Sequence, residues 1–125
     1  MSELFKMDGN YILNDEGEPE QCRDLLTWAQ WFEDHPAERV VLQTQIGAIL
    51  ISTVFLGIDH NHFRNGPPIL WETMIRGGPA DLASTMNRYT SKLAALEGHA
   101  RAVAAVETAV HISAVVDSPQ PGREE

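Results

Sequence analysis

The clearest helical pattern of hydrophobic positions lies between Arg23 and Asp34. The apolar side chains recur at i, i+1, i+4 and i+7, with a tryptophan on either edge of the stripe: Leu25, Leu26, Ala29 and Phe32, with Trp28 and Trp31. This spacing predicts an amphipathic helix over 23–34. Asp24 falls where the helix dipole favours an acid, and Pro36 cannot continue the helix. Before it, the β-favouring run Tyr11–Asn14 and the turn Asp15-Glu16-Gly17 predict a small hairpin.

From Arg39 the pattern becomes β-branched and alternating, which predicts two strands joined near Gly47. The second strand is apolar on both parities, so a central place in the sheet is expected. A third strand is expected over Ile69–Ile75, ended by Gly77-Gly78-Pro79 and reached through a connection of about 12 residues. The segment Asp81–Tyr89 is read as an edge strand.

The C-terminal part has a second helical stripe, formed by Leu96, His99, Val103, Val106 and Val110. Thr90 or Ser91 can cap this helix, which is expected to run to about Ser113. The residues beyond Asp117 have nothing to bury and are expected to be mobile.

Separate α and β stretches, without regular alternation, predict an α+β fold rather than a doubly wound one. We expect a twisted, mainly antiparallel sheet of four to six strands with two helices packed on one face. Residues 1–116 are expected to form a single domain, followed by a tail over 117–125.

The chain has 125 residues, of which 43% are hydrophobic, enough for one domain to close a core. It contains one cysteine, Cys22, so a reducing compartment is expected. The start of the chain has no apolar run typical of a secretion signal, and the longest near-apolar run, Ile46–Ile58, is too short to span a membrane. We therefore expect a cytoplasmic protein without membrane attachment.

The formal net charge is −9, and its distribution is uneven. Residues 1–38 carry ten acids and two bases, whereas the rest of the chain carries eight acids and seven bases. A negative field repels phosphate backbones, so direct nucleic-acid binding is not expected. The acids either keep a small domain soluble or form a contact surface for a basic protein partner, with Glu33, Asp34 and Glu38 as the candidate contacts.

One loop gathers candidate metal ligands. In extended chain His60 and His62 point to the same side, so both imidazoles could reach one metal, with Asp59 or Glu72 completing the shell. The alternative is a loop in which Asp59 and Asn61 bond nearby backbone amides. We favour that alternative and expect neither a bound metal nor a cofactor.

His99 lies in the middle of an apolar stripe and follows Gly98, a glycine that suggests a close approach by another group. We expect His99 to be buried with a carboxylate partner, and Glu72 is the candidate. Alternatively, His60, Glu72 and His99 form a catalytic acid and base set. The chain has no nucleophile elbow or phosphate loop, and the carboxylates near Cys22 disfavour a thiolate.

The run Ser52–Asn61 (STVFLGIDHN) resembles a group of small bacteriophage and prophage proteins that have no established activity. The likeness continues through Gly66–Ile75 (GPPILWETMI) and covers roughly Tyr11–Val106. The resemblance implies a phage or mobile-element origin and supplies no catalytic residues. His62 departs from the family pattern, which leaves Asp59, His60, Glu72 and His99 as the matching polar set.

These observations favour a non-enzymatic phage-type accessory protein that binds a protein partner, such as a host or anti-phage-defence component that it inhibits. The alternative is a metal-dependent or acid/base hydrolase using Asp59, His60, Glu72 and His99. Association between copies of the chain is left open.

Overall fold

The computed structural model describes residues 8–62, 65–78, 82 and 86–117. Its N-terminal part is a two-stranded antiparallel sheet of β1 (Tyr11–Leu13) and β2 (Pro19–Gln21), followed by α1 (Leu25–Asp34) and the short α2 (Pro36–Arg39). The predicted hairpin and first helix are thus confirmed. Pro36 does end α1, but it also starts α2, because a proline at the first helical position loses no hydrogen bond.

The start of α1 is fixed by Asp24, whose side chain accepts from the amides of Leu26 and Thr27. The Thr27 hydroxyl also donates to this carboxylate over 2.9 Å, and these hydrogen bonds lower the pKa of Asp24. The indole of Trp28 then ties α1 to the rest of the chain, because its Nε1 donates to the carbonyls of Tyr11 and Gly57, each at 3.1 Å.

The main sheet has four antiparallel strands in the order of the sequence: β3 (Val40–Ile46), β4 (Ile49–Phe55), β5 (Trp71–Arg76) and β6 (Met86–Tyr89). The predicted central position of the second strand of the pair is confirmed, since β4 lies between β3 and β5. The predicted edge strand is also found, in the shorter span of β6; residues 79–81 and 83–85 lie outside the described part of the chain.

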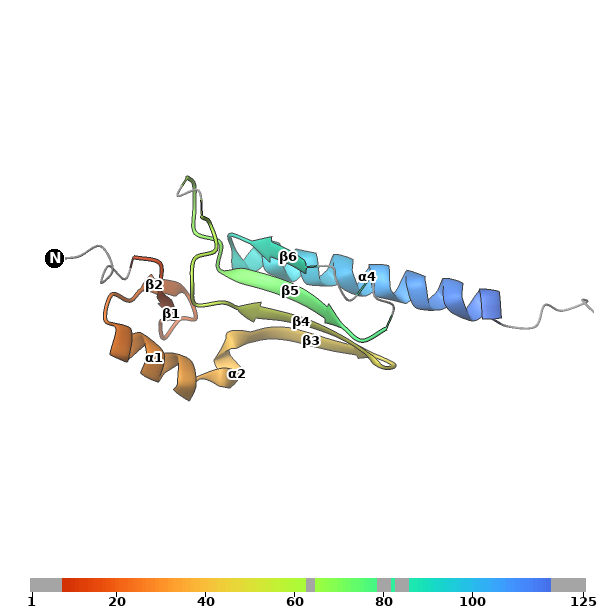
Figure 1. Ribbon diagram of the computed structural model, residues 1–125, viewed down its shortest axis with the longest axis horizontal. Helices are drawn as coiled ribbons and strands as arrows, with labels where there is room; N and C mark the ends of the chain where they lie inside the picture. Colours follow the sequence, from red (N-terminus) through yellow and green to blue (C-terminus); the bar gives the residue numbers. More distant parts are fainter. Residues whose placement is uncertain (1–7, 63–64, 79–81, 83–85, 118–125) are drawn as a thin grey trace, which may run out of the picture.

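One long helix, α4 (Lys92–Asp117), packs along one face of this sheet (Figure 1). Its start is capped as predicted, since the Ser91 hydroxyl accepts from the Ala94 amide over 3.1 Å. Its last turns continue beyond the turn that joins β3 and β4, whereas α1, α2 and the small sheet lie toward the opposite end of the molecule.

The core lies between α4 and the main sheet in two clusters. One joins Ile49, Ile51 and Ile75 to Ala102 and Val106, and the other joins Phe55, Leu70, Trp71 and Tyr89 to Ala95. Each large apolar side chain that leaves water here stabilises the fold by about 1.5–3 kcal/mol. Gly98 allows the close contact that the sequence suggested: a Cβ built there would come 2.1 Å from the Tyr89 hydroxyl oxygen.

The α+β prediction is therefore correct, with the difference that the six described strands divide into sheets of two and four. The division places α1 mainly against β1, and of the described helices α4 is the one that runs along the main sheet. Among the helices of the described part, none is long and apolar enough to cross a membrane.

Candidate functional site

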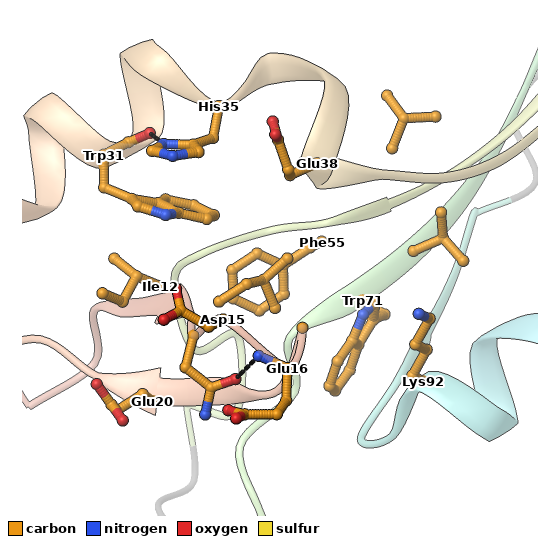
Figure 2. A pocket seen from close by; sticks show the side chains of 15 residues that line it. Ile12, Asp15, Glu16, Glu20, Trp31, His35, Glu38, Phe55, Trp71 and Lys92 are labelled. Atoms are coloured by element: carbon orange, nitrogen blue, oxygen red, sulfur yellow. Dashed lines mark hydrogen bonds between the residues drawn. The ribbon is translucent and has the colours of Figure 1, made fainter.

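A hollow lies where the N-terminal elements meet the end of the main sheet. It is a cleft of about 830 Å³. The β1–β2 hairpin forms one wall and the α1–α2 corner the other, while β3–β5 and the start of α4 close its base (Figure 2). We call this hollow the hairpin cleft. It unites segments that are up to 80 residues apart, from Ile12 to Lys92.

Aromatic rings form the base of the hairpin cleft. Phe55 contacts Trp31 edge-on, with 6.1 Å between ring centroids, and Trp71 at 5.7 Å on its other side. Phe55 and Trp71 are almost fully buried, whereas Trp31 is half-buried. Such edge-to-face pairs hold the rings in fixed positions. Trp31 is therefore the tryptophan that a molecule in the cleft can reach.

The imidazole of His35 extends this aromatic surface. It stacks on Trp31, with 4.9 Å between centroids and 16° between the ring planes. Its Nδ1 lies 2.7 Å from the Trp31 carbonyl oxygen, which can only accept, so Nδ1 carries a hydrogen. In the neutral ring Nε2 is then an acceptor. A stacked indole and imidazole make a flat surface on which a planar group can lie.

The rim of the hairpin cleft is acidic. Three carboxylates come from the hairpin, those of Asp15, Glu16 and Glu20, and Glu38 lies across the cleft from the hairpin, at the α1–α2 corner (Figure 2). Lys92 is the one lysine or arginine among the described lining residues. All four acids are exposed, so the formal charge around the opening is −3 and attracts cations.

The turn that carries two of these acids is well ordered by local hydrogen bonds. Asn14 Oδ1 accepts from the amides of Glu16 and Glu18 at 2.9 and 3.0 Å, as an asparagine commonly does in a turn. Gly17 closes the turn with a φ of +78°. The acids of the hairpin are thus presented from a defined backbone.

The predicted histidine loop is held by backbone contacts. Asp59 Oδ1 accepts from the amides of Asn61 and Ile69 at 2.8 and 2.9 Å, which confirms the hydrogen-bonded alternative for Asp59. Asn61 instead donates to the carbonyls of Asn65 and Pro67. His60 Nδ1 donates to the Ile58 carbonyl over 2.8 Å, and the rings of His60 and His62 are 6.2 Å apart. Within the described ranges, no group of three or more His, Cys, Asp or Glu side chains is placed to hold a metal.

His99 is buried, as predicted, but its predicted partner is wrong. Its Nδ1 lies 2.7 Å from Thr53 Oγ1 and its Nε2 lies 2.8 Å from Thr44 Oγ1. Thr53 continues to Thr73 at 2.6 Å, and the Tyr89 hydroxyl donates to Thr73 over 3.1 Å. Burial lowers the pKa of His99, so the neutral ring is favoured. We call these five side chains the His99 network.

Glu72 cannot join this network because it lies on the other face of β5. Thr73 faces α4, and successive side chains of a strand point to opposite faces. Glu72 is buried beside Arg88 of β6, with 3.0 Å between Arg88 Nε and Glu72 Oε2. The set Asp59, His60, Glu72 and His99 is therefore divided between a loop and two faces of the sheet, so the structure does not assemble it into one acid/base site.

The three acids predicted as contacts with a partner are all exposed. Only Glu38 of these lines the hairpin cleft, while Asp34 accepts from Gln30 within α1 over 2.9 Å. Sequence reasoning missed the hairpin acids Asp15, Glu16 and Glu20 as site residues. The sequence feature that could have indicated these acids is their density around a glycine turn. No pattern within the hairpin, however, indicates that Trp31 and Glu38 lie across from it.

The hairpin cleft is thus an acidic, aromatic-based hollow, and it differs from the sites that the sequence suggested. Its accessible groups are carboxylates, one lysine and two stacked rings. These groups recognise charge and planarity. Comparisons with protein-family models, curated proteins and solved structures find no match to this chain.

Proposed function

We propose that the protein acts by binding a basic segment of a protein partner in the hairpin cleft. The observation that carries this proposal is the combination of four rim carboxylates with the Trp31–His35 stack, whose two rings line the same cleft. A carboxylate beside an aromatic face is a favourable environment for a guanidinium or ammonium group. The proposed role is non-enzymatic, since recognition by charge and stacking requires no bond to be made or broken.

Arginine is the residue that this arrangement suits best. Its planar guanidinium makes paired hydrogen bonds to carboxylates and stacks on aromatic rings, whereas the lysine ammonium acts as a point charge. Stacking of a guanidinium on an aromatic ring already occurs within this chain, where the Arg39 guanidinium lies 3.7 Å from the centre of the Phe32 ring. An arginine from a partner that enters between the hairpin and Glu38 would meet carboxylates in addition to aromatic rings.

The class of partner is the part of the proposal that rests on the resemblance to phage proteins. The resemblance implies a phage or mobile-element origin, so we propose a host or anti-phage-defence protein with a basic surface segment. The charge pattern supports a basic partner, because residues 1–38 hold ten of the 18 acids of the chain.

The test uses a synthetic peptide of alternating arginine and leucine as the probe, observed through the indole NMR signals of the protein. We expect the Trp31 signal to shift on titration, while that of Trp28, whose indole is bonded to Tyr11 and Gly57, serves as the internal reference. Affinity should fall as salt is added, because exposed charges are screened within about 8 Å at physiological ionic strength. A peptide with glutamate in place of arginine should not bind.

A matched pair of variants locates the contact. Glu16→Lys with Glu38→Lys should weaken binding about tenfold or more, since hydrogen bonds to charged groups contribute roughly 1.5–3 kcal/mol each. Glu33→Lys with Asp34→Lys changes the net charge equally on α1 and should have a clearly smaller effect. Equal weakening by both pairs would show that the acidic surface attracts the peptide generally and would refute the cleft as the binding site.

A further inference from the structure

The outer edge of β3 is an unpaired strand edge with an unusual composition. Strand order places β3 at one side of the main sheet, with β4 as its one partner among the described strands. Its sequence, VVLQTQI, contains no charged residue and no proline. Soluble proteins usually protect such edges with charges, prolines, bulges or a covering element. Of these devices, the described part of the chain shows a bulge at this edge, at the register shift between Val40 and Leu42.

The turn geometry shows which backbone groups face outward. Ile46 pairs with Ile49 across the two-residue turn Gly47–Ala48, so Ile46, Thr44 and Leu42 direct their amides and carbonyls toward β4. The amides and carbonyls of Gln43 and Gln45 therefore point away from the sheet. Outside the strand ladders, none of the backbone hydrogen bonds of the described residues involves residues 41–46.

We propose that two copies of this chain pair antiparallel through β3, on a two-fold axis at Thr44. The regular part of the strand, Leu42–Ile46, has Thr44 as its midpoint. In this register Gln43 of each copy lies opposite Gln45 of the other, and the outward backbone groups form four hydrogen bonds. The result is a continuous sheet of eight strands.

Side chains on both faces match in this register. Leu42, which is 42% exposed, lies opposite Ile46 of the second copy on the face that carries α4, and the contact occurs twice by symmetry. On the other face each pair is glutamine against glutamine. Gln43 Nε2 already donates to Ser52 Oγ and Gln45 Nε2 to the Gly47 carbonyl. Each amide keeps its oxygen and a second N–H with which it can bond to the facing glutamine. The strand is thus complementary to itself, which is the reason to prefer a second copy over a strand of another protein.

The charge distribution also favours the antiparallel arrangement. β3 follows directly on the acidic N-terminal part, and Glu38 and Arg39 precede its first residue. A parallel pairing would bring two such acidic parts together. The antiparallel pairing separates them by about the length of the strand, roughly 24 Å for seven residues, and places the uncharged Gly47–Ala48 turn of one copy near the start of the other strand.

The first test is the oligomeric state of the full chain by analytical ultracentrifugation over a wide concentration range. We expect a dimer in reversible equilibrium, and we expect Leu42→Lys to weaken it roughly tenfold or more, because symmetry counts the substitution twice. Ile112→Lys is the matched control. It introduces the same residue at a 56% exposed position in the last turns of α4, outside β3, and should leave the dimer intact.

The second test reports the register without relying on a destabilising variant. In hydrogen-bonded antiparallel pairs the Cα atoms are about 5.5 Å apart, within the range that a disulfide spans. A Gln43→Cys protein mixed with a Gln45→Cys protein should therefore form mixed cross-linked dimers on oxidation. Each variant alone should cross-link far less, because its own cysteines are diagonal neighbours, about 7–8 Å apart or more. The native Cys22 is buried and present in both.

A monomer at every concentration would overturn the proposal, and so would a dimer that Ile112→Lys dissociates while Leu42→Lys does not. Efficient cross-linking of Gln43→Cys with itself would refute the register centred on Thr44. These results are independent of the hairpin cleft, because the peptide-binding test reads Trp31 and not the oligomeric state.

Discussion

The two faces of the main sheet satisfy their buried polar groups in opposite ways. On the face covered by α4, His99 is bonded through both ring nitrogens to threonines, and the chain of hydroxyls ends at Tyr89. On the other face, Glu72 is buried to a similar extent but bears a charge and pairs with Arg88. Neighbouring residues of β5, Thr73 and Glu72, thus belong to different kinds of environment.

Exposure decides which polar groups each face of the sheet can hold. The Arg88 side chain is 39% exposed, so its charge stays partly in water and the ion pair does not bear the full cost of desolvation. Under α4 the network is built instead from neutral groups that can both donate and accept. In the described part of the chain, no buried side-chain nitrogen or oxygen lacks a hydrogen-bond partner.

On the face covered by α4, we expect the largest loss of stability from His99→Ala. The change removes packing and leaves Thr44 and Thr53 without their shared partner, each effect costing about 1–3 kcal/mol. We expect the melting temperature to fall by several degrees or more, because 1 kcal/mol corresponds to roughly 3–6 °C in a domain of this size. His111→Ala, at an exposed position of the same helix, is the control. Unchanged melting of His99→Ala would show that the network contributes nothing to stability.

Gly98→Ala tests the close packing beside that network. Alanine is the better helix former by about 1 kcal/mol, so an unpacked site would gain stability. The new methyl group would instead meet the buried ring of Tyr89, with atoms at 2.1–2.3 Å. We expect a net loss of about 1–3 kcal/mol, typical of overpacking. Denaturant unfolding measures it, and Ser113→Ala on the exposed side of α4 should be neutral or slightly stabilising. A stabilised Gly98→Ala would contradict the contact.

On the face away from α4, we expect Arg88→Gln to lower the free energy of unfolding by about 1–2 kcal/mol, less than His99→Ala. Arg88 is partly exposed, so water can approach from its side and hydrogen-bond to the remaining Glu72 carboxylate. Arg76→Gln removes an exposed arginine from the end of β5 and is the control. Added salt should reduce the contribution of the Glu72–Arg88 pair to the free energy of unfolding, and it should leave the contribution of the His99 network unchanged. A salt-dependent loss in His99→Ala would contradict the neutral description.

The smallest expected effect is a pH dependence of stability that belongs to His99. Because burial lowers its pKa in the folded state, the unfolded chain takes up the proton first as the pH falls. The contribution is fully present above the unfolded value of about 6.5 and declines below it, by at most about 1.4 kcal/mol per pH unit. Urea unfolding at about pH 7.5 and 5.5 should show a smaller decline in His99→Gln than in the parent, with other groups common to both. An equal decline would assign the effect elsewhere.

Local patterns predicted the elements well, because each depends on residues close in sequence. The turn at Gly17, the cap at Ser91 and the contact at Gly98 were all visible in the chain. The pairing of His99 with Glu72 failed because the prediction ignored the period of two in β5. Trp71, Thr73 and Ile75 share the parity that faces α4, so Glu72 had to face away.

Local sequence patterns could not predict the hairpin cleft. It exists because Trp31, Phe55 and Trp71 meet across three elements, and because the hairpin folds back over them. The sequence placed Trp31 at the edge of a helical apolar stripe, and the structure shows it half-buried against Phe55. What the sequence lacked was any local signal for the distance between the hairpin and the α1–α2 corner.

The hydrogen bonds of Trp28 also indicate the order in which parts of the chain fold. Its indole and the amide of Tyr11 both donate to the carbonyl of Gly57, so the N-terminal elements have no docking site until β4 has left the ribosome. Alone, a ten-residue helix and a short hairpin are marginal in water. The β3–β4 hairpin, closed by a two-residue turn, can form first. The start of the chain is thus expected to acquire its structure after the middle, and the cleft to be completed last, when Lys92 arrives.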